Sequence, residues 1–385
     1  MFYADMNGST PICSSVEDKI QYFLKERFFG NPNASHSMGV KLLKEIEDSR
    51  KFIGQILGAN KDQIIFNSGS SEGISHVFYS LLMPLLLNER IPSSQRKKKV
   101  IISKIEHSCI INAAQYYQNL GIEILWLDVA YDGVVYLDQM KEYLENYASD
   151  IVFICVMAAN NETGVIQPFE KIGELAQKYH IPFICDTTQF IAKAPFSFNS
   201  SFIDFAFCSS HKIGAIIGSG FILAKNPKLL SKDFLFGGGQ ENSLRGGTQN
   251  YLGICAMAVA LKYYDENKQH LKGLEMNRNN LEKSLRAYAK DLIIFGEDAP
   301  RLPGTSFWGI PKIPGFIIQE QLQKENIFVS TTSACCDAKQ QGSRILLNMG
   351  YDEKTAKSAV RLSFCIQHSD DDFKYLEMKL AKYLH

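Results

Sequence analysis

The chain has 385 residues, of which 45% are hydrophobic and 21% charged, and its formal net charge is zero. This balance gives no electrostatic attraction to nucleic acid or to an anionic membrane surface, so neither is an expected partner. The chain is longer than one hydrophobic core usually supports, which predicts a large domain and a smaller one. No apolar run approaches the ~20 residues of a membrane-spanning helix, and the first residues lack a signal-peptide pattern, so we expect a soluble, cytoplasmic protein.

From about residue 40 to residue 225, helical and strand-like patterns alternate, which is typical of an α/β domain with a mostly parallel sheet. Seven short apolar runs are the predicted strands, and they begin at Gln63, Val100, Ile122, Ile151, Ile181, Phe202 and Gly220. A long polar stretch, 263–289, is predicted to be helical and to lead into a smaller α/β domain. We therefore assign 15–262 to the large domain, and 1–14 with 263–385 to the small domain.

The nine cysteines are scattered, several of them inside predicted strands, and no CxxC spacing occurs. This distribution argues against a disulfide framework and against a zinc site, so no metal is expected. Cys335 and Cys336 stand side by side among small polar residues, in "STTSACCDA". A thiol is a nucleophile only as thiolate in a partly exposed, electropositive setting. From this pair alone, the interpretation as ordinary small apolar residues is preferred.

Two predicted strands end on residues that suit the chemistry of pyridoxal phosphate. Asp186 ends one apolar run, and Ser209, His211 and Lys212 follow another. Open α/β sheets bind ligands at the carboxyl ends of their strands. A pyridoxal phosphate enzyme needs a lysine for the Schiff base and an acid for the pyridine nitrogen. Each residue also has an ordinary explanation, since a strand-end acid is often a helix cap and lysine is a common surface cation.

Four other segments fit the same interpretation. The turn 66–73, "FNSGSSEG", leads from a strand into a helix and suits a phosphate, although it is also an ordinary α/β connection. His107 follows a strand, where it could stack on a ring or relay a proton, although a lone histidine is more often structural. Asn160 and Asn161 offer amides to a ring hydroxyl, in a turn type that is common for local reasons. The segment 237–250 holds more glycines than a turn requires.

With "SGSSE", "EHS", "NNETG", "DTTQ", "SSHK" and "SAC" in this order, the chain resembles the cysteine desulfurases. These are pyridoxal phosphate enzymes of the class V aminotransferase group with fold type I, and the likeness covers nearly the whole chain. It implies a homodimer that converts L-cysteine to L-alanine and transfers the sulfur to an enzyme cysteine as a persulfide. A sulfur-acceptor protein, either an iron-sulfur scaffold or a sulfur carrier, would then take the sulfur for cluster assembly or for thiolation of cofactors or tRNA.

The resemblance also implies roles for individual residues. Lys212 binds pyridoxal phosphate as a Schiff base and moves the α proton, His107 stacks on the ring, and Cys335 is the sulfur-accepting nucleophile. Asp186 pairs with the pyridine nitrogen. The other implied cofactor-binding residues are Ser70, Ser71, Asn161, Gln189, Ser209, His211 and, from the neighbouring subunit, Thr248. Asn31 and Arg361 are similar to the residues that take the substrate carboxylate, for which a bidentate arginine is apt.

Alternatives remain at this stage. The turn 214–218 reads "GAIIG" where the family usually has a Gly-Pro-Lys/Arg-Gly turn, and a second family arginine after Arg361 has no counterpart. These departures leave the turnover rate and the acceptor open. A selenocysteine lyase or another class V aminotransferase would share every feature except the need for Cys335. A non-catalytic, partner-binding homologue is a further alternative, but the presence of both Lys212 and Asp186 argues against it.

Overall fold

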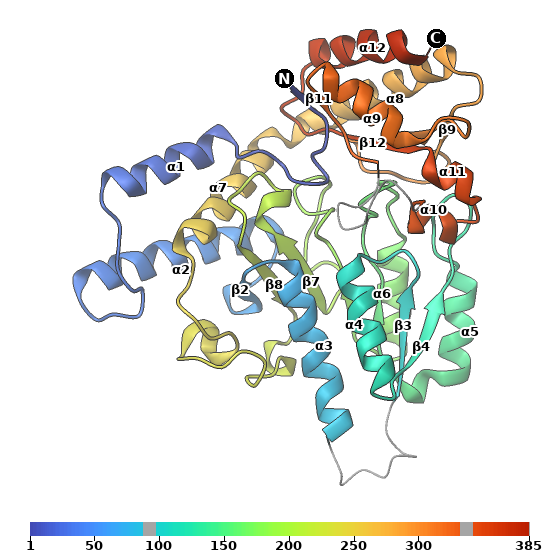
Figure 1. Cartoon of the computed structure of the whole chain (residues 1–385). Coiled ribbons are helices and arrows are strands. Elements are labelled where there is room, and N and C mark those ends of the chain that lie inside the picture. The colour runs from blue at the N-terminus through green and yellow to red at the C-terminus, as the bar shows by residue number, and fades with distance from the viewer. Residues whose placement is uncertain (88–97, 332–341, 385) are drawn as a thin grey trace.

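A seven-stranded sheet forms the centre of the lower part of the molecule (Figure 1). The computed structural model describes residues 1–87, 98–331 and 342–384. Across the sheet, the strands are β2 (Ile64–Asn67), β8 (Gly220–Ala224), β7 (Phe205–Ser209), β6 (Phe183–Cys185), β5 (Ile151–Cys155), β3 (Lys99–Ser103) and β4 (Glu123–Leu127). Strand β8 is antiparallel to both of its neighbours, and the pairs from β7 to β4 are parallel. The predicted α/β class with a mostly parallel seven-stranded sheet is therefore confirmed.

Both faces of this sheet are covered, which is why its strands are mostly apolar rather than alternating. Successive side chains of a strand point to opposite faces, so Phe153 belongs to one apolar cluster and Ile154 to the other. Helices α3 (Ser70–Leu87) and α4 (Ser108–Asn119) pack on the Phe153 face. The Ile154 face is covered by α2 (Ser37–Leu57), α5 (Leu137–Tyr147), α6 (Phe169–Lys178) and α7 (Tyr251–Asn267).

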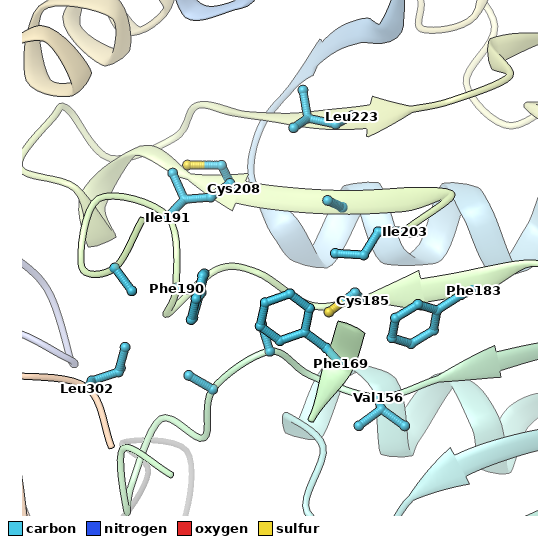
Figure 2. Packing of buried hydrophobic residues seen from close by; sticks show 14 of the residues in the cluster. Val156, Phe169, Phe183, Cys185, Phe190, Ile191, Ile203, Cys208, Leu223 and Leu302 are labelled. Atoms are coloured by element: carbon cyan, nitrogen blue, oxygen red, sulfur yellow. The ribbon is translucent and has the colours of Figure 1, made fainter. Parts of the chain in front are cut away.

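Figure 2 shows part of the Ile154 face, where aromatic rings and two thiols pack together. Phe169 and Phe190 meet edge to face, with ring centroids 5.1 Å apart. Cys185 and Cys208 lie in this apolar cluster and are fully buried. Burial raises the pKa of the Cys185 thiol well above its usual range. These cysteines are therefore small core residues, as the sequence predicts.

The upper part of the molecule holds two smaller sheets (Figure 1). One is antiparallel and consists of β12 (Ala359–Ser363), β10 (Thr305–Gly309) and β9 (Ile293–Ile294), and the other pairs β1 (Phe2–Tyr3) with β11 (Ile327–Phe328). The helices here are α8 (Leu271–Tyr288), α9 (Gly315–Lys324), α10 (Arg344–Asn348), α11 (Glu353–Lys357) and α12 (Asp370–Leu384). Residues of α8, α9 and α12 share an apolar cluster with these strands. The remaining helix, α1 (Ser14–Lys25), extends to one side with α2 (Figure 1).

The predicted continuous helix over 263–289 is wrong in detail. Helix α7 begins earlier, at Tyr251, and ends at Asn267, and a 3₁₀ turn, Lys268–His270, separates it from α8. The first half of α7 is buried and apolar, so the polar helical pattern becomes visible in the sequence only near Tyr263. The domain boundaries 15–262 and 263–385 stay a prediction. In the described part of the chain, no helix is long and apolar enough to cross a membrane.

Candidate active site

A cavity of about 270 Å³ lies where strands of the large sheet end, beside β12 and the first residues of the chain. Because the carboxyl ends of parallel strands meet at one edge of a sheet, residues distant in sequence are neighbours there. The cavity brings together most of the predicted site residues: Ser70, Ser71, His107, Asn161, Asp186, Gln189, Ser209, His211, Lys212 and Arg361. The sequence motifs therefore belong to one place in the fold.

Lys212 closes a 3₁₀ turn, Ser210–Lys212, directly after β7. Its Nζ donates to the backbone carbonyls of Asn7 and Gly8, at 2.7 Å each. The N-terminal segment therefore lies against this lysine. The predicted lysine is thus held at the cavity by two backbone acceptors.

Asp186 follows β6 directly, and its carboxylate is bound by a turn of its own segment. The backbone N–H of Thr188 donates to Oδ1 at 3.0 Å. The Thr188 hydroxyl lies 2.5 Å from the same Oδ1 and 2.6 Å from Ser70 Oγ. An ionised carboxylate only accepts, so the single hydroxyl proton goes to Asp186. Thr188 therefore connects the acidic side of the cavity to its serine side.

A second carboxyl group, Glu106, lies buried next to the cavity. The Ser103 hydroxyl and the Met157 backbone N–H donate to its Oε1, at 2.5 and 2.8 Å. Burial raises the pKa of Glu106 to about 8, and the charge of Asp186 raises it further. Glu106 is therefore mostly protonated at neutral pH. Glu106 was not predicted from the sequence, because in "EHS" it stands beside a histidine with a clearer possible role.

His107 is the N-cap of α4, and its Nδ1 accepts from the backbone N–H of Cys109 at 3.2 Å. In the neutral ring the proton then sits on Nε2. Burial lowers the pKa of His107, and the charges of Lys212 and Arg344 lower it further against the opposing charge of Asp186. Cys109 also lines the cavity, but burial raises the pKa of its thiol to about 12. This cysteine is therefore not a ready nucleophile.

The serine-lined part of the cavity is suited to receive an anion. Helix α3 begins at Ser70, where the first amides of a helix lack intrahelical partners. The Ser209 hydroxyl accepts from the Ser70 backbone N–H at 2.8 Å and donates to Ser70 Oγ at 3.0 Å. Burial lowers the pKa of His211 to about 4, and the charges of Lys212 and Lys193 lower it further. His211 is therefore a neutral neighbour of this anion site at neutral pH.

Arg361 lies on β12 and is almost fully buried. Its Nη1 donates to the backbone carbonyl of Asn161 at 2.8 Å, and its Nη2 donates to Asp5 Oδ1 at 2.6 Å. The guanidinium is therefore held from two sides while it lines the cavity. This places a buried cation where a substrate carboxylate could meet it.

Three predicted residues are not brought to this cavity. Asn31 is exposed between α1 and α2, where its Oδ1 accepts from the Asn33 backbone N–H at 3.0 Å. Thr248 is exposed and lines a separate hollow together with Gly218. Cys335 lies outside the described residues. In this structure, Asn31 and Thr248 therefore do not contact the cavity of their own chain.

The chain is similar to known proteins along nearly its whole length. Residues 2–376 match the family model described as Aminotransferase class-V. The chain is 29% identical over 376 residues to the cysteine desulfurase IscS of Dictyoglomus turgidum, which covers 97% of this chain and 92% of that protein. A solved NifS-like protein superposes with a TM-score of 0.89 at 28% identity, covering 100% of this chain and 99% of the other.

A third similar protein, solved as SspA in complex with cysteine, has a TM-score of 0.80 at 26% identity and covers 94% of this chain and 99% of its own. The predicted resemblance to cysteine desulfurases is confirmed, because relatives with that name match along nearly the whole chain. The chain belongs to the class-V aminotransferase family.

Proposed function

We propose that this protein is a pyridoxal phosphate-dependent cysteine desulfurase. The observation that carries the proposal is the meeting of Lys212, Asp186 and His107 with a cluster of serines in one cavity. The residues fit the cofactor: the hydroxyls of Ser70, Ser71 and Ser209 and the start of α3 suit its phosphate, and the Asp186 carboxylate at the other side suits its pyridine nitrogen. When bound, pyridoxal phosphate acts as an electron sink for the α carbon of an amino acid.

The residues that line the cavity have separate roles in the proposed reaction. Lys212 binds the cofactor covalently and moves the proton at the α carbon of the substrate. His107, with its proton on Nε2, stacks on the ring and offers a donor. Gln189 and Asn161 address the ring hydroxyl. Arg361 takes the substrate carboxylate, because a guanidinium can bind both carboxylate oxygens.

L-Cysteine is the proposed substrate, and Cys335 the proposed sulfur acceptor. The relatives named cysteine desulfurase and the cysteine complex of SspA support the substrate. The described residues before and after segment 332–341 contact residues at or next to the cavity. Ser330 exchanges backbone hydrogen bonds with Arg361, and Arg344 Nη2 donates to the Glu106 carbonyl at 2.5 Å.

In the overall reaction, the Cys335 thiol takes the sulfur of L-cysteine as a persulfide and the remaining carbon skeleton leaves as L-alanine. A sulfur-acceptor protein, an iron-sulfur scaffold or a sulfur carrier, then receives the sulfur. The proposed enzyme is a homodimer, in which the Thr248 of one subunit reaches the phosphate in the other. Asn31, the second proposed carboxylate-binding residue, also lies outside the cavity of its own chain. It would likewise have to reach the cavity of the other subunit.

Cofactor uptake tests this proposal first. The purified protein should take up pyridoxal phosphate, show a visible absorbance band, and lose that band on borohydride reduction with the reduced adduct on Lys212. It should then form L-alanine from L-cysteine. A protein that takes up no pyridoxal phosphate, or an adduct on another lysine, would refute the proposal. Rapid release of selenide from selenocysteine, with no turnover of L-cysteine, would favour a selenocysteine lyase.

A further inference from the structure

Lys193 contacts Gln189, one of the residues that line the cavity, and no sequence motif draws attention to it. It closes a turn after Asp186, in which its own backbone N–H donates to the Phe190 carbonyl at 3.0 Å. The residue before it, Ala192, has a φ of 62°, in the left-handed region that costs energy for an alanine. The chain thus adopts a strained turn at the point where it presents Lys193.

The amine of Lys193 contacts two side-chain amides. Its Nζ donates to Gln189 Oε1 at 2.5 Å and to Asn7 Oδ1 at 2.9 Å. An ammonium has only donors, so each amide must turn its oxygen toward the lysine and its nitrogen away. Burial holds the pKa of Lys193 well below its usual range, and the charges of Lys212 and Arg361 lower it further. Even the neutral amine keeps two N–H groups, which suffice for the two oxygens.

The orientation of Gln189 has a consequence at the cavity. With Oε1 on Lys193, its Nε2 donates to the Asn7 backbone carbonyl at 2.9 Å. The same carbonyl accepts from Lys212 at 2.7 Å. Gln189 therefore offers the cavity a donor rather than an acceptor.

Asn7 is held just as completely. Its Nδ2 donates to Thr305 Oγ1 at 3.0 Å, and its backbone N–H donates to Ser363 Oγ at 2.9 Å. Thr305 and Ser363 belong to β10 and β12, so Asn7 connects the three-stranded sheet to the cavity that it lines. Together with Lys193, these hydrogen bonds fix the orientation of both side-chain amides, those of Asn7 and Gln189.

We propose that Lys193 is a positioning residue for cofactor binding, which orients Gln189 so that its Nε2 faces an oxygen of the bound ring. This inference rests on the proposed function, because it requires that the cavity takes pyridoxal phosphate. Lys193 itself touches neither cofactor nor substrate in this account; it acts through Gln189.

The test is equilibrium dialysis of the full chain against pyridoxal phosphate, with three single variants. Lys193→Met removes the donors and should raise the dissociation constant about tenfold, as for the loss of one hydrogen bond. Lys193→Arg keeps a donor-only side chain and should bind as the parent does. Lys225→Met is the matched control, because Lys225 also donates to a buried neighbour, the Ser201 carbonyl, but lies outside the cavity. It should leave the constant unchanged.

A double-mutant cycle with Gln189→Ala separates positioning from a general structural effect. If Lys193 acts through Gln189, Lys193→Met should cost little further affinity once Gln189 is an alanine. An equal loss in both backgrounds, or an unchanged constant for Lys193→Met alone, would overturn the inference. Should Lys193→Met fail to fold, Lys193→Leu, which also lacks donors, takes its place in the cycle. A parent protein that binds no pyridoxal phosphate would instead refute the proposed function, and this inference with it.

Discussion

Glu106 and Asp186 are two carboxyl groups at one site with different environments. Asp186 ends a strand at the cavity and receives two hydrogen bonds from Thr188. Glu106 is fully buried, and its Oε2 has no hydrogen-bond partner among the described residues. A buried carboxylate oxygen without a donor is costly, which is why the pKa of Glu106 is raised to about 8. Burial therefore keeps one acid neutral beside the acid proposed to serve the cofactor.

This difference predicts a pH-dependent stability. The pKa of Glu106 in the folded protein lies above its usual value of 4.5, so the folded state binds this proton more tightly than the unfolded state does. The associated stability is fully present below about pH 4.5 and is lost as the pH rises toward about 8. Glu106→Gln removes the ionisable group. We expect its free energy of unfolding, relative to the parent, to improve by roughly 3 kcal/mol between pH 5 and pH 8.

Urea denaturation at a series of pH values measures this effect. The exposed Glu142 provides the control, and Glu142→Gln should follow the parent at every pH. If the curves of parent and Glu106→Gln ran parallel across this range, Glu106 would not be a buried neutral acid in the folded protein.

For single residues, the sequence identifies polar side chains that directly follow a predicted apolar strand. Asp186 and Lys212 were predictable because an acid and a lysine after two apolar runs are unusual enough to notice. Asn7, Thr188 and Lys193 were not predictable as site residues, because their roles arise from contacts between segments up to 356 residues apart. Asn31 and Thr248 entered only through the family resemblance, and the fold of one chain leaves both outside the cavity.

At the scale of elements, the segment 237–250 shows how buried charge holds a loop. Three successive residues, Glu241, Asn242 and Ser243, have positive φ values of 49°, 56° and 64°. Left-handed geometry costs roughly 1 kcal/mol for each such residue. The Glu241 carboxylate accepts two hydrogen bonds from Arg50, at 2.8 Å each, and one from the Phe66 backbone N–H at 2.9 Å. These bonds anchor the segment against β2.

Glu241→Gln should therefore destabilise the protein. It leaves the Arg50 guanidinium, whose side chain is only 9% exposed, without its buried counter-charge. Breaking one partner of a buried pair costs about 3 kcal/mol or more. Glu47 also pairs with Arg50, but its side chain is 45% exposed, so Glu47→Gln should cost no more than about 1 kcal/mol. Denaturant unfolding measures the loss of stability in both variants. Equal losses for Glu241→Gln and Glu47→Gln would contradict the proposed anchoring of segment 237–250 by Glu241.

The elements themselves were largely predictable, and their failures have physical causes. All seven strands of the large sheet coincide with predicted apolar runs, because a strand covered on both faces has few polar positions. The antiparallel direction of β8 is a matter of pairing, which an apolar run does not specify. Strands β1, β9 and β11 have two residues each, too few for any pattern. The interruption between α7 and α8 was not predictable, because the sequence between them remains helical in composition.

For the whole molecule, the position of Thr248 argues for a dimer. Thr248 is exposed, and large apolar side chains near it in the chain or in space are exposed too: Phe236 is 78% exposed and Ile217 is 72% exposed. Asn250 connects the two neighbourhoods through its hydrogen bond to Ser219 Oγ at 3.0 Å. Apolar side chains exposed together favour a protein partner, and a two-fold pairing would bring Thr248 to the other subunit.

Subunit mixing tests this arrangement. Lys212→Ala and Thr248→Ala homodimers should both be impaired in forming L-alanine. In a hybrid, the Thr248→Ala subunit keeps its own Lys212 and receives an intact Thr248 from its neighbour, so one complete site returns. Co-refolding the two variants should therefore restore activity, with up to one site in each hybrid. A monomer by light scattering, or no recovery in verified hybrids, would contradict a shared site.

The proposed function requires that this chain transfers the sulfur of L-cysteine to its own Cys335. Mass spectrometry of the protein after a single turnover with L-cysteine tests it most directly. We predict a persulfide on Cys335 with one equivalent of L-alanine, no persulfide in Cys335→Ala although it still takes up pyridoxal phosphate, and a normal persulfide in Cys336→Ala. A persulfide on Cys336, or full L-alanine production by Cys335→Ala, would contradict the account.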